Sequence, residues 1–278
     1  MTGTPQIRKV IEMSEGYGEA YAEKFRAMVQ ELEEHPEIEV TSFNFAEPAS
    51  QEDLAAAEEY YGLGPGMREF YSTSDGLTLS WEYTGNRFEE LGDQLGARVE
   101  GNIDIWSLEQ TFTDHQGFIY FDHQEEPRFE DLHPLDYFVN EACSALCLDG
   151  SENPEVHYHY LGEEASTLGV DFGGYLDLLL ISRGFWYWPK SIAAPEYFNE
   201  YNPISYEEAS FRLIMPELFE DFDNSAFVRQ DGYEAEYGDF ERLLDQAGGT
   251  ADLSDYSYTA QLAEKQPARA TGDPAAGS

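Results

Sequence analysis

The fold is decided by residues 50–83, SQEDLAAAEEYYGLGPGMREFYSTSDGLTLSWEY. The first part predicts a helix, because Ser50 can act as the N-cap and Asp53 follows it at the capping-box position. Apolar residues then recur every three or four positions, as on one face of a helix, at Leu54, Ala57 and Tyr61. Gly62 is the expected end, since glycine readily adopts the left-handed conformation that closes many helices.

The second part of this stretch predicts a short helix, a turn and a strand. Pro65 suits the first turn of a helix whose buried side comprises Met67, Phe70 and Tyr71. Residues 74–76, Ser-Asp-Gly, form a turn cluster. A half-buried strand should follow, because apolar and polar residues alternate from Leu77 to Tyr83.

The stretch resembles the opening motif of the SUKH superfamily, the Smi/Knr-type proteins. In that family an acidic helix ends in Leu-Gly, a Leu-Pro pair opens the next helix, and an aromatic pair precedes an Asn-Gly or Asp-Gly turn and a strand. The matching residues are Glu58, Tyr61-Gly62, Gly64-Pro65, Phe70-Tyr71 and Asp75-Gly76. Tyr61, Gly64 and Asp75 stand where the family usually has Leu, Leu and Asn.

A second match lies at residues 171–188, DFGGYLDLLLISRGFWYW, which is similar to the late helix of the same family. The resemblance implies a SUKH-like α+β domain over residues 36–200. It also implies a non-catalytic binding role, since members are commonly immunity proteins that bind and neutralise a cognate toxin, often a nuclease. Other members act as interaction hubs in regulation.

The remaining patterns predict further strands and flanking helices. A helix is expected over residues 6–34, a first strand over 37–45, a polar loop over 84–101 and a surface loop over 122–131. Strands are expected near 103–106, 117–121, 145–148 and 156–160, a short element near 135–138, and a helix over 171–183 that ends at Gly184. Short strands with little helix between them indicate an antiparallel sheet flanked by helices, which is the α+β class.

The chain divides into four predicted segments. They are an N-terminal helical segment (1–35), the α+β domain (36–200), a C-terminal helical extension (201–247) and a disordered tail (248–278). In the extension, Ser205 and Glu208 predict the start of a helix that ends before Pro216, and residues 233–246 predict another. Apolar periodicity fades after Ala247, which is why the tail is expected to be disordered.

The charge balance is extreme. The chain has 56 acidic and 15 basic residues, which gives a formal net charge of −41. Phosphate groups and anionic membranes attract clustered Lys and Arg, so neither nucleic acid nor a membrane is an expected partner. Two interpretations of the acidity stay open: a solvated surface suited to solubility or a salty milieu, and steering toward a basic partner.

Cysteine content and hydropathy bear on the compartment. No run approaches 18 consecutive apolar residues, and the N-terminus lacks the apolar core of a signal peptide. Cys143 and Cys147 are the only cysteines, and they are expected to be small buried apolar side chains rather than a disulfide framework or a zinc site. A cytoplasmic protein is therefore predicted.

Enzyme signatures are sparse. His157 and His159 would share one side of a strand, and Asp149 or Glu155 is near, but no third ligand has a diagnostic metal-site spacing. The sequence contains no G-x-S-x-G, Walker-type or strand-anchored G-x-G-x-x-G motif. We predict no enzyme, no catalytic residues, no metal and no cofactor; a small metallo-hydrolase using the two histidines is the alternative from the enzyme class.

The predicted binding face combines aromatic anchors with acids, which suits a basic protein surface. Its residues are Asp75, Trp81, Glu82, Tyr83, Asp104 and Trp106. Carboxylates on such a face would mimic the phosphates of a nuclease substrate and speed association. We predict an immunity protein for a basic, nuclease-type toxin, with a regulatory or scaffold protein of the same fold as the alternative. The prediction requires that these side chains are not fully buried.

Overall fold

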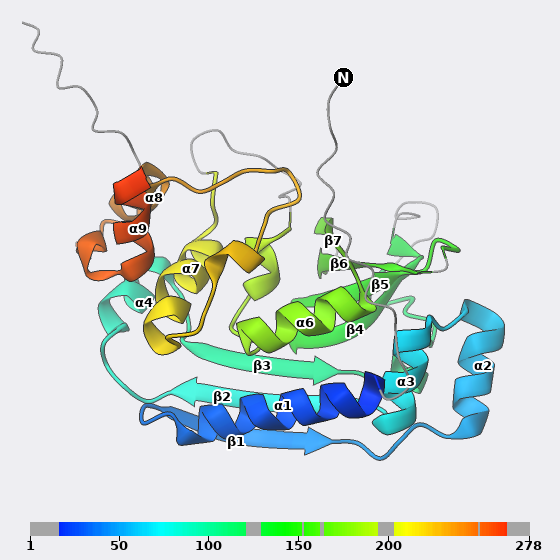
Figure 1. Cartoon of the computed structure of the whole chain (residues 1–278). Helices are drawn as coiled ribbons and strands as arrows, with labels where there is room; N and C mark the ends of the chain where they lie inside the picture. The colour runs from blue at the N-terminus through cyan, green and yellow to red at the C-terminus, as the bar shows by residue number, and fades with distance from the viewer. Residues whose placement is uncertain are drawn as a thin grey trace, which may run out of the picture.

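The computed structural model describes residues 17–120, 129–151, 153–161, 164–193, 203–249 and 251–265. In these residues the chain forms a seven-stranded sheet whose neighbours are all antiparallel and follow one another in sequence order (Figure 1). Helices pack on this sheet, so the α+β class predicted from the sequence is confirmed.

The strands are β1 (Ile38–Phe45), β2 (Leu77–Tyr83), β3 (Glu100–Ile105), β4 (Leu132–Val139), β5 (Ala142–Cys147), β6 (Glu155–Tyr160) and β7 (Glu164–Asp171). Five of them match predicted strands, with ends displaced by a few residues, and β4 lies where a short element of unspecified type was expected. β7 was not expected, because its sequence EASTLGVD lacks strict alternation of apolar and polar residues.

The strand expected over residues 117–121 is wrong where the structure describes it. Residues 116–120 form a turn, in which the Gly117 N–H donates to the Tyr120 carbonyl at 2.6 Å. Gly117 has a φ of 84°, which favours glycine and breaks the strand. Ile119 and Tyr120 are nevertheless buried, because the turn folds them onto the sheet.

Residues 50–83 fold as predicted. In α2 (Gln51–Tyr61) the Ser50 hydroxyl accepts the Asp53 N–H at 3.1 Å, and Gly62 ends the helix with a φ of 71°. α3 (Pro65–Thr73) has its proline in the first turn, and β2 follows directly after the 74–76 turn.

The other helices are α1 (Tyr17–Glu34), α4 (Glu89–Leu95), α5 (Leu108–Thr111), α6 (Phe172–Ser182), α7 (Tyr206–Leu218), α8 (Tyr237–Gln246) and α9 (Ser257–Lys265). Short 3-10 turns occur at Trp188–Ser191, Asn224–Ala226 and Leu253–Asp255. α7 continues past Pro216, where the sequence predicted its end. Residues 6–16, the first part of the helix expected over 6–34, lie outside the described residues. Most of the loop expected over 122–131 does so too.

Two segments expected to lack structure contain helices among their described residues. The 84–101 segment contains α4, which contributes Leu91 and Leu95 to the core. The expected disordered tail contains α9, whose Thr259 is buried and donates its hydroxyl to the Tyr256 carbonyl at 2.9 Å. Each segment carries too few apolar residues for a clear pattern, so tertiary packing decides its state.

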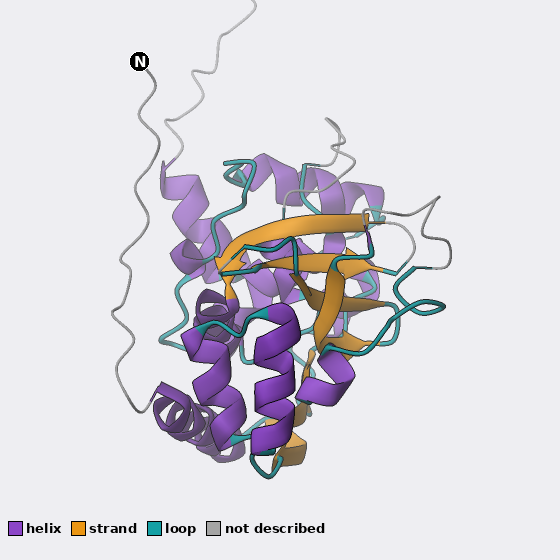
Figure 2. Cartoon of the chain, turned by 90° about the vertical axis from the view of Figure 1, so that its right-hand side faces the viewer, coloured by secondary structure: helices purple, strands orange, loops and turns teal. Residues whose placement is uncertain are grey.

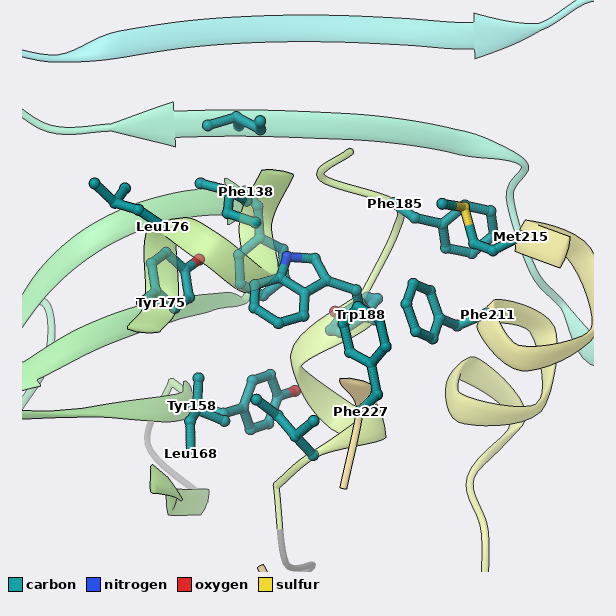
Figure 3. Packing of buried hydrophobic residues seen from close by; sticks show 14 of the residues in the cluster. Phe138, Tyr158, Leu168, Tyr175, Leu176, Phe185, Trp188, Phe211, Met215 and Phe227 are labelled. Atoms are coloured by element: carbon teal, nitrogen blue, oxygen red, sulfur yellow. The ribbon is translucent and has the colours of Figure 1, made fainter. Parts of the chain in front are cut away.

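Most of the helices gather on one side of the strands, and a short helix lies on the other side (Figure 2). α1 and α6 lie across the more heavily covered face of the sheet in Figure 1. Inward-facing side chains of β2 and β3, such as Trp81 and Ile103, join the helices in one core cluster. Trp188 lies in the middle of this core, next to Tyr175 and Phe227 (Figure 3). Because strand side chains alternate, the polar residues of β2 and β3 point to the opposite face.

Arg183 joins three elements at the end of α6. Its φ is 53°, and its carbonyl accepts the Trp81 indole N–H at 2.7 Å. Its buried guanidinium pairs with Glu31 of α1 at 2.8 Å and lies 4.0 Å from the centre of the Phe219 ring. The helix therefore ends at Ser182, one residue earlier than predicted, because these contacts hold Arg183 in the left-handed conformation.

A buried ion network anchors the C-terminal helices. The Glu208 carboxylate on α7 accepts from Arg212 at 2.9 Å and from Arg229 at 3.3 Å, and all three side chains are almost fully buried. Arg212 also donates to the carbonyls of Ser191 and Phe227, at 2.9 and 3.0 Å. Such a network ties Ser191, α7 and the 227–229 segment together, since each charge depends on its partners for compensation.

The sheet forks between β3 and β4. These strands share a single register pair, Ile105 with Asp136, whereas β2 and β3 pair along their whole shared length. Where β4 turns away, the segment 184–186 takes its place beside β3: the Asn102 N–H donates to the Gly184 carbonyl at 2.8 Å, and the Trp186 N–H donates to the Glu100 carbonyl at 2.9 Å. Gly184 is required there, because a side chain would meet Ile103.

Asp136 holds the fork from inside. Its fully buried carboxyl accepts the Asp104 backbone N–H at 2.8 Å and the Tyr175 hydroxyl of α6 at 2.6 Å. It thereby replaces a missing bond between the strands and connects both to the covering helix. Burial raises the pKa of Asp136 to about 7, although the two hydrogen bonds favour the ionised form.

We predict that Glu208→Gln destabilises the fold by about 3 kcal/mol, because it leaves the buried Arg212 guanidinium without a carboxylate and the buried Arg229 guanidinium with Asp231 alone. Urea unfolding measures the loss. Glu241→Gln, at an exposed position on α8, is the control and should change the free energy of unfolding by less than about 0.5 kcal/mol. Equal stability of the two variants would contradict the role of the network.

We predict that Asp136→Asn removes a pH dependence of stability. The folded pKa of Asp136 is raised, so the folded state binds more protons than the unfolded state between about pH 4 and pH 7, and wild-type stability falls as the pH rises through this window. The asparagine variant lacks this dependence. The difference between the two unfolding free energies should therefore change by up to about 4 kcal/mol between about pH 4 and pH 8, and a constant difference would refute the assignment.

Candidate functional site

A groove of about 550 Å³ opens at the fork, on the face of the sheet turned away from α1 and α6. One wall is the polar face of β2 and β3, and the other is the β4–β5 hairpin together with Trp186. Its charged and aromatic lining residues, apart from the buried Trp81 and Phe138, are Glu82, Arg98, Glu100, Asp104, Tyr137, Glu141 and Trp186. The groove exists because β4 diverges from β3 while the 184–186 segment fills only the inner side of the gap.

The floor of the groove is closed by Asn102. Its amide nitrogen donates to the Phe138 carbonyl across the fork at 2.9 Å, and its amide oxygen accepts the Ser80 hydroxyl at 2.7 Å. The polar atoms of this side chain are thus used within the sheet. A ligand in the groove would meet the walls rather than the floor.

The walls are strongly acidic. Glu82 is exposed, and within the described residues its carboxylate has no hydrogen-bond donor or ion-pair partner. Asp104 is half-buried and accepts only the Trp106 indole N–H, at 3.3 Å, and burial raises the pKa of Asp104. Glu141 accepts the Tyr187 hydroxyl at 2.6 Å. These carboxylates are incompletely compensated, so the groove favours a cation.

Four of the predicted binding residues lie at this groove or beside it. Trp81, Glu82 and Asp104 line it, and Trp106 lies beside it through its bond to Asp104. Whether they bind a partner stays a prediction.

Trp81 also borders the groove, but its side chain is fully buried and points to the opposite face, where its indole N–H donates to the Arg183 carbonyl. Neighbouring residues of one strand face opposite sides of the sheet, so the Trp81 ring and the Glu82 carboxylate do not share a surface. The buried ring does not meet the requirement that a binding side chain be accessible.

Asp75 and Tyr83 lie away from the groove. The Asp75 carboxylate accepts the Leu108 N–H at 2.8 Å and so fixes the start of α5. Tyr83 is half-buried against Phe88, with ring centres 5.1 Å apart, and its hydroxyl lies 3.3 Å from Glu37. Both positions indicate structural contacts.

A row of aromatic rings continues from the groove along β4. Successive ring centres lie 4.6–6.0 Å apart, through Tyr137, Phe118, Trp106, His115, His133, Tyr61 and Phe112. This row was not predicted from the sequence. A signal existed, because Phe112, His115 and Phe118 recur every three residues. Burial lowers the pKa of both histidines, whose rings share the Thr111 carbonyl at 3.1 and 2.9 Å.

In the described residues, His157 and His159 do not form part of a metal site, as the metallo-hydrolase alternative would require. His159 is fully buried and His157 half-buried on β6, and the ring of His159 lies 4.8 Å from that of Phe129. Among the residues that the structure describes, no group of three or more His, Cys, Asp or Glu side chains could hold a metal ion. Cys143 is buried in the same part of the sheet, and burial raises its pKa, which makes it unreactive.

No family model matches the chain, and no curated protein matches it either. The resemblance to the SUKH superfamily therefore rests on its motifs alone and stays a prediction. In the described part of the chain, no helix is long and apolar enough to cross a membrane.

Proposed function

We propose that this protein is a non-catalytic binding protein whose acidic groove docks a basic protein. The observation that carries the proposal is the groove at the β3–β4 fork, where Glu82, Asp104 and Glu141 stand beside Tyr137 and Trp186. Carboxylates give long-range attraction and correct orientation to a basic partner, and aromatic side chains supply contact area.

The rest of the surface supports recognition by charge. Among the described residues, the large hydrophobic side chains that are exposed are Tyr61, Tyr206 and Val228, and none of them lines the groove. An apolar interface would need a contiguous patch. A chain with a net charge of −41 would instead approach a cationic surface quickly, and high salt would slow the association.

The partner we favour is a toxin of the nuclease type. Enzymes that bind nucleic acid present clustered Lys and Arg to phosphates. A groove lined with carboxylates would occupy that cationic site in place of the substrate, which is inhibition without catalysis. The SUKH-like motifs point to the same role, and the cytoplasm is where such an inhibitor would protect its own cell.

The test compares wild type with the double variant Glu82→Gln/Asp104→Asn. Each protein captures partners from the native host extract at about 50 mM salt, and the captured protein is then purified and its affinity measured. We expect a basic partner whose binding falls about tenfold or more in the double variant and falls again at high salt. Expression of that partner alone should stop growth, and only the wild-type protein should restore it.

Glu33→Gln/Asp245→Asn is the matched control, because it removes the same two charges from exposed positions on α1 and α8. It should bind as wild type does. Equal loss in both variants would mean that overall charge rather than the groove holds the partner, and capture of no basic protein would also refute the proposal. If the captured basic partner is not toxic, the protein is a regulatory or scaffold protein rather than an immunity protein.

A further inference from the structure

Three glutamates stand side by side across the sheet next to the groove. The strand register places Glu39 of β1 directly opposite Glu82 of β2, and Glu82 directly opposite Glu100 of β3. All three point to the uncovered face, where Glu39 and Glu82 are exposed. Like charges directly opposite one another destabilise a sheet, so this row works against folding in the free protein.

The row is poorly compensated. Within the described residues, its one ion pair is Arg98 with Glu100, at 3.5 Å, and the Arg98 side chain is 72% exposed. Solvent-exposed pairs at this distance contribute little. Three opposed glutamates on an open face break a local rule of sheet stability, as real proteins do at functional sites.

An aromatic ring is fixed at the end of this row. The backbone N–H of Trp186 donates to the carbonyl of Glu100, which holds its half-exposed indole at the groove. The indole packs edge-on against Tyr187, with ring centres 4.8 Å apart and an interplanar angle of 86°. Tyr137 lines the same groove.

This combination distinguishes between the two basic side chains. A guanidinium is planar, so it can stack on an indole and still donate two parallel N–H bonds to a carboxylate. An ammonium is a compact, strongly hydrated charge that satisfies the carboxylates as well but gains less from the ring. Charge alone would accept either side chain, whereas the ring beside the glutamate row favours arginine.

We infer that the groove selects arginine over lysine and docks an extended, arginine-bearing segment of its partner. The inference rests on the proposed function, and it specifies the chemistry of the partner. Guanidinium groups would stack on Trp186 and pair with Glu82 and Glu100, which relieves the repulsion along the row.

The test uses two peptides of equal charge, hexa-arginine and hexa-lysine, titrated calorimetrically into the full chain at about 50 mM salt. We expect hexa-arginine to bind about tenfold more tightly. Trp186→Leu should reduce the ratio between the two peptides to about one, whereas Trp186→Phe, which keeps an aromatic face, should retain part of the preference. Circular dichroism checks that both variants fold.

Other variants separate this inference from the proposed function. Glu82→Gln should weaken both peptides, and Glu33→Gln on α1 should weaken neither. If both peptides bind equally and both need Glu82, the arginine preference is wrong while the acidic groove stands. If the Trp186→Leu variant still prefers hexa-arginine to the same extent, the indole is not the cause of the preference and the inference is overturned. If neither peptide responds to Glu82→Gln, both the inference and the proposed function fail.

Discussion

One buried carboxyl connects the three parts of the structure that make the groove. Asp136 binds the backbone of β3 through the Asp104 N–H and binds α6 through the Tyr175 hydroxyl, at the point where regular pairing between β3 and β4 stops. With that bond in place the strands can diverge without leaving an unpaired buried amide, which would otherwise be costly. The fork then admits the 184–186 segment, and the gap that remains on the outer face is the groove.

The distribution of charge follows a division between interior and surface. Three arginines, Arg183, Arg212 and Arg229, are buried in ion pairs that hold the helices to one another and to the core. The few basic residues of the chain are thus used partly inside, while most of the acids remain outside. Opposed carboxylates on the sheet face are tolerated because the buried networks and the large aromatic core stabilise the fold elsewhere. Because these buried ion pairs use some of the few basic residues, fewer of them remain to balance the acids on the surface.

Local signals in the sequence predict the elements that they specify directly. The Ser50 cap, Gly62, Pro65 and the alternation after Asp75 determine α2, α3 and β2, because each acts within a few residues. α4 and α9 could not be predicted in this way, since packing against distant residues decides their state. Trp81 was expected on the wrong face although its strand was right, because aromatic and acidic neighbours were grouped without respecting alternation. The fork depends on Asp136 meeting Tyr175 and Asp104, contacts that no local pattern contains, and so Trp186 and the glutamate row emerge only from the register.

The role of Asp136 in shaping the groove is tested most directly by amide hydrogen exchange, resolved residue by residue by NMR in the free protein at neutral pH. The Asp104 amide has no ladder partner on β4, but it donates to the buried Asp136 carboxyl. It should therefore exchange as slowly as the Ile105 amide at the last regular pair of the fork, and far more slowly than the exposed Asn140 in the β4–β5 turn. Exchange of the Asp104 amide at the rate of Asn140 would show that Asp136 does not hold the strands, and the groove would then need a different structural basis.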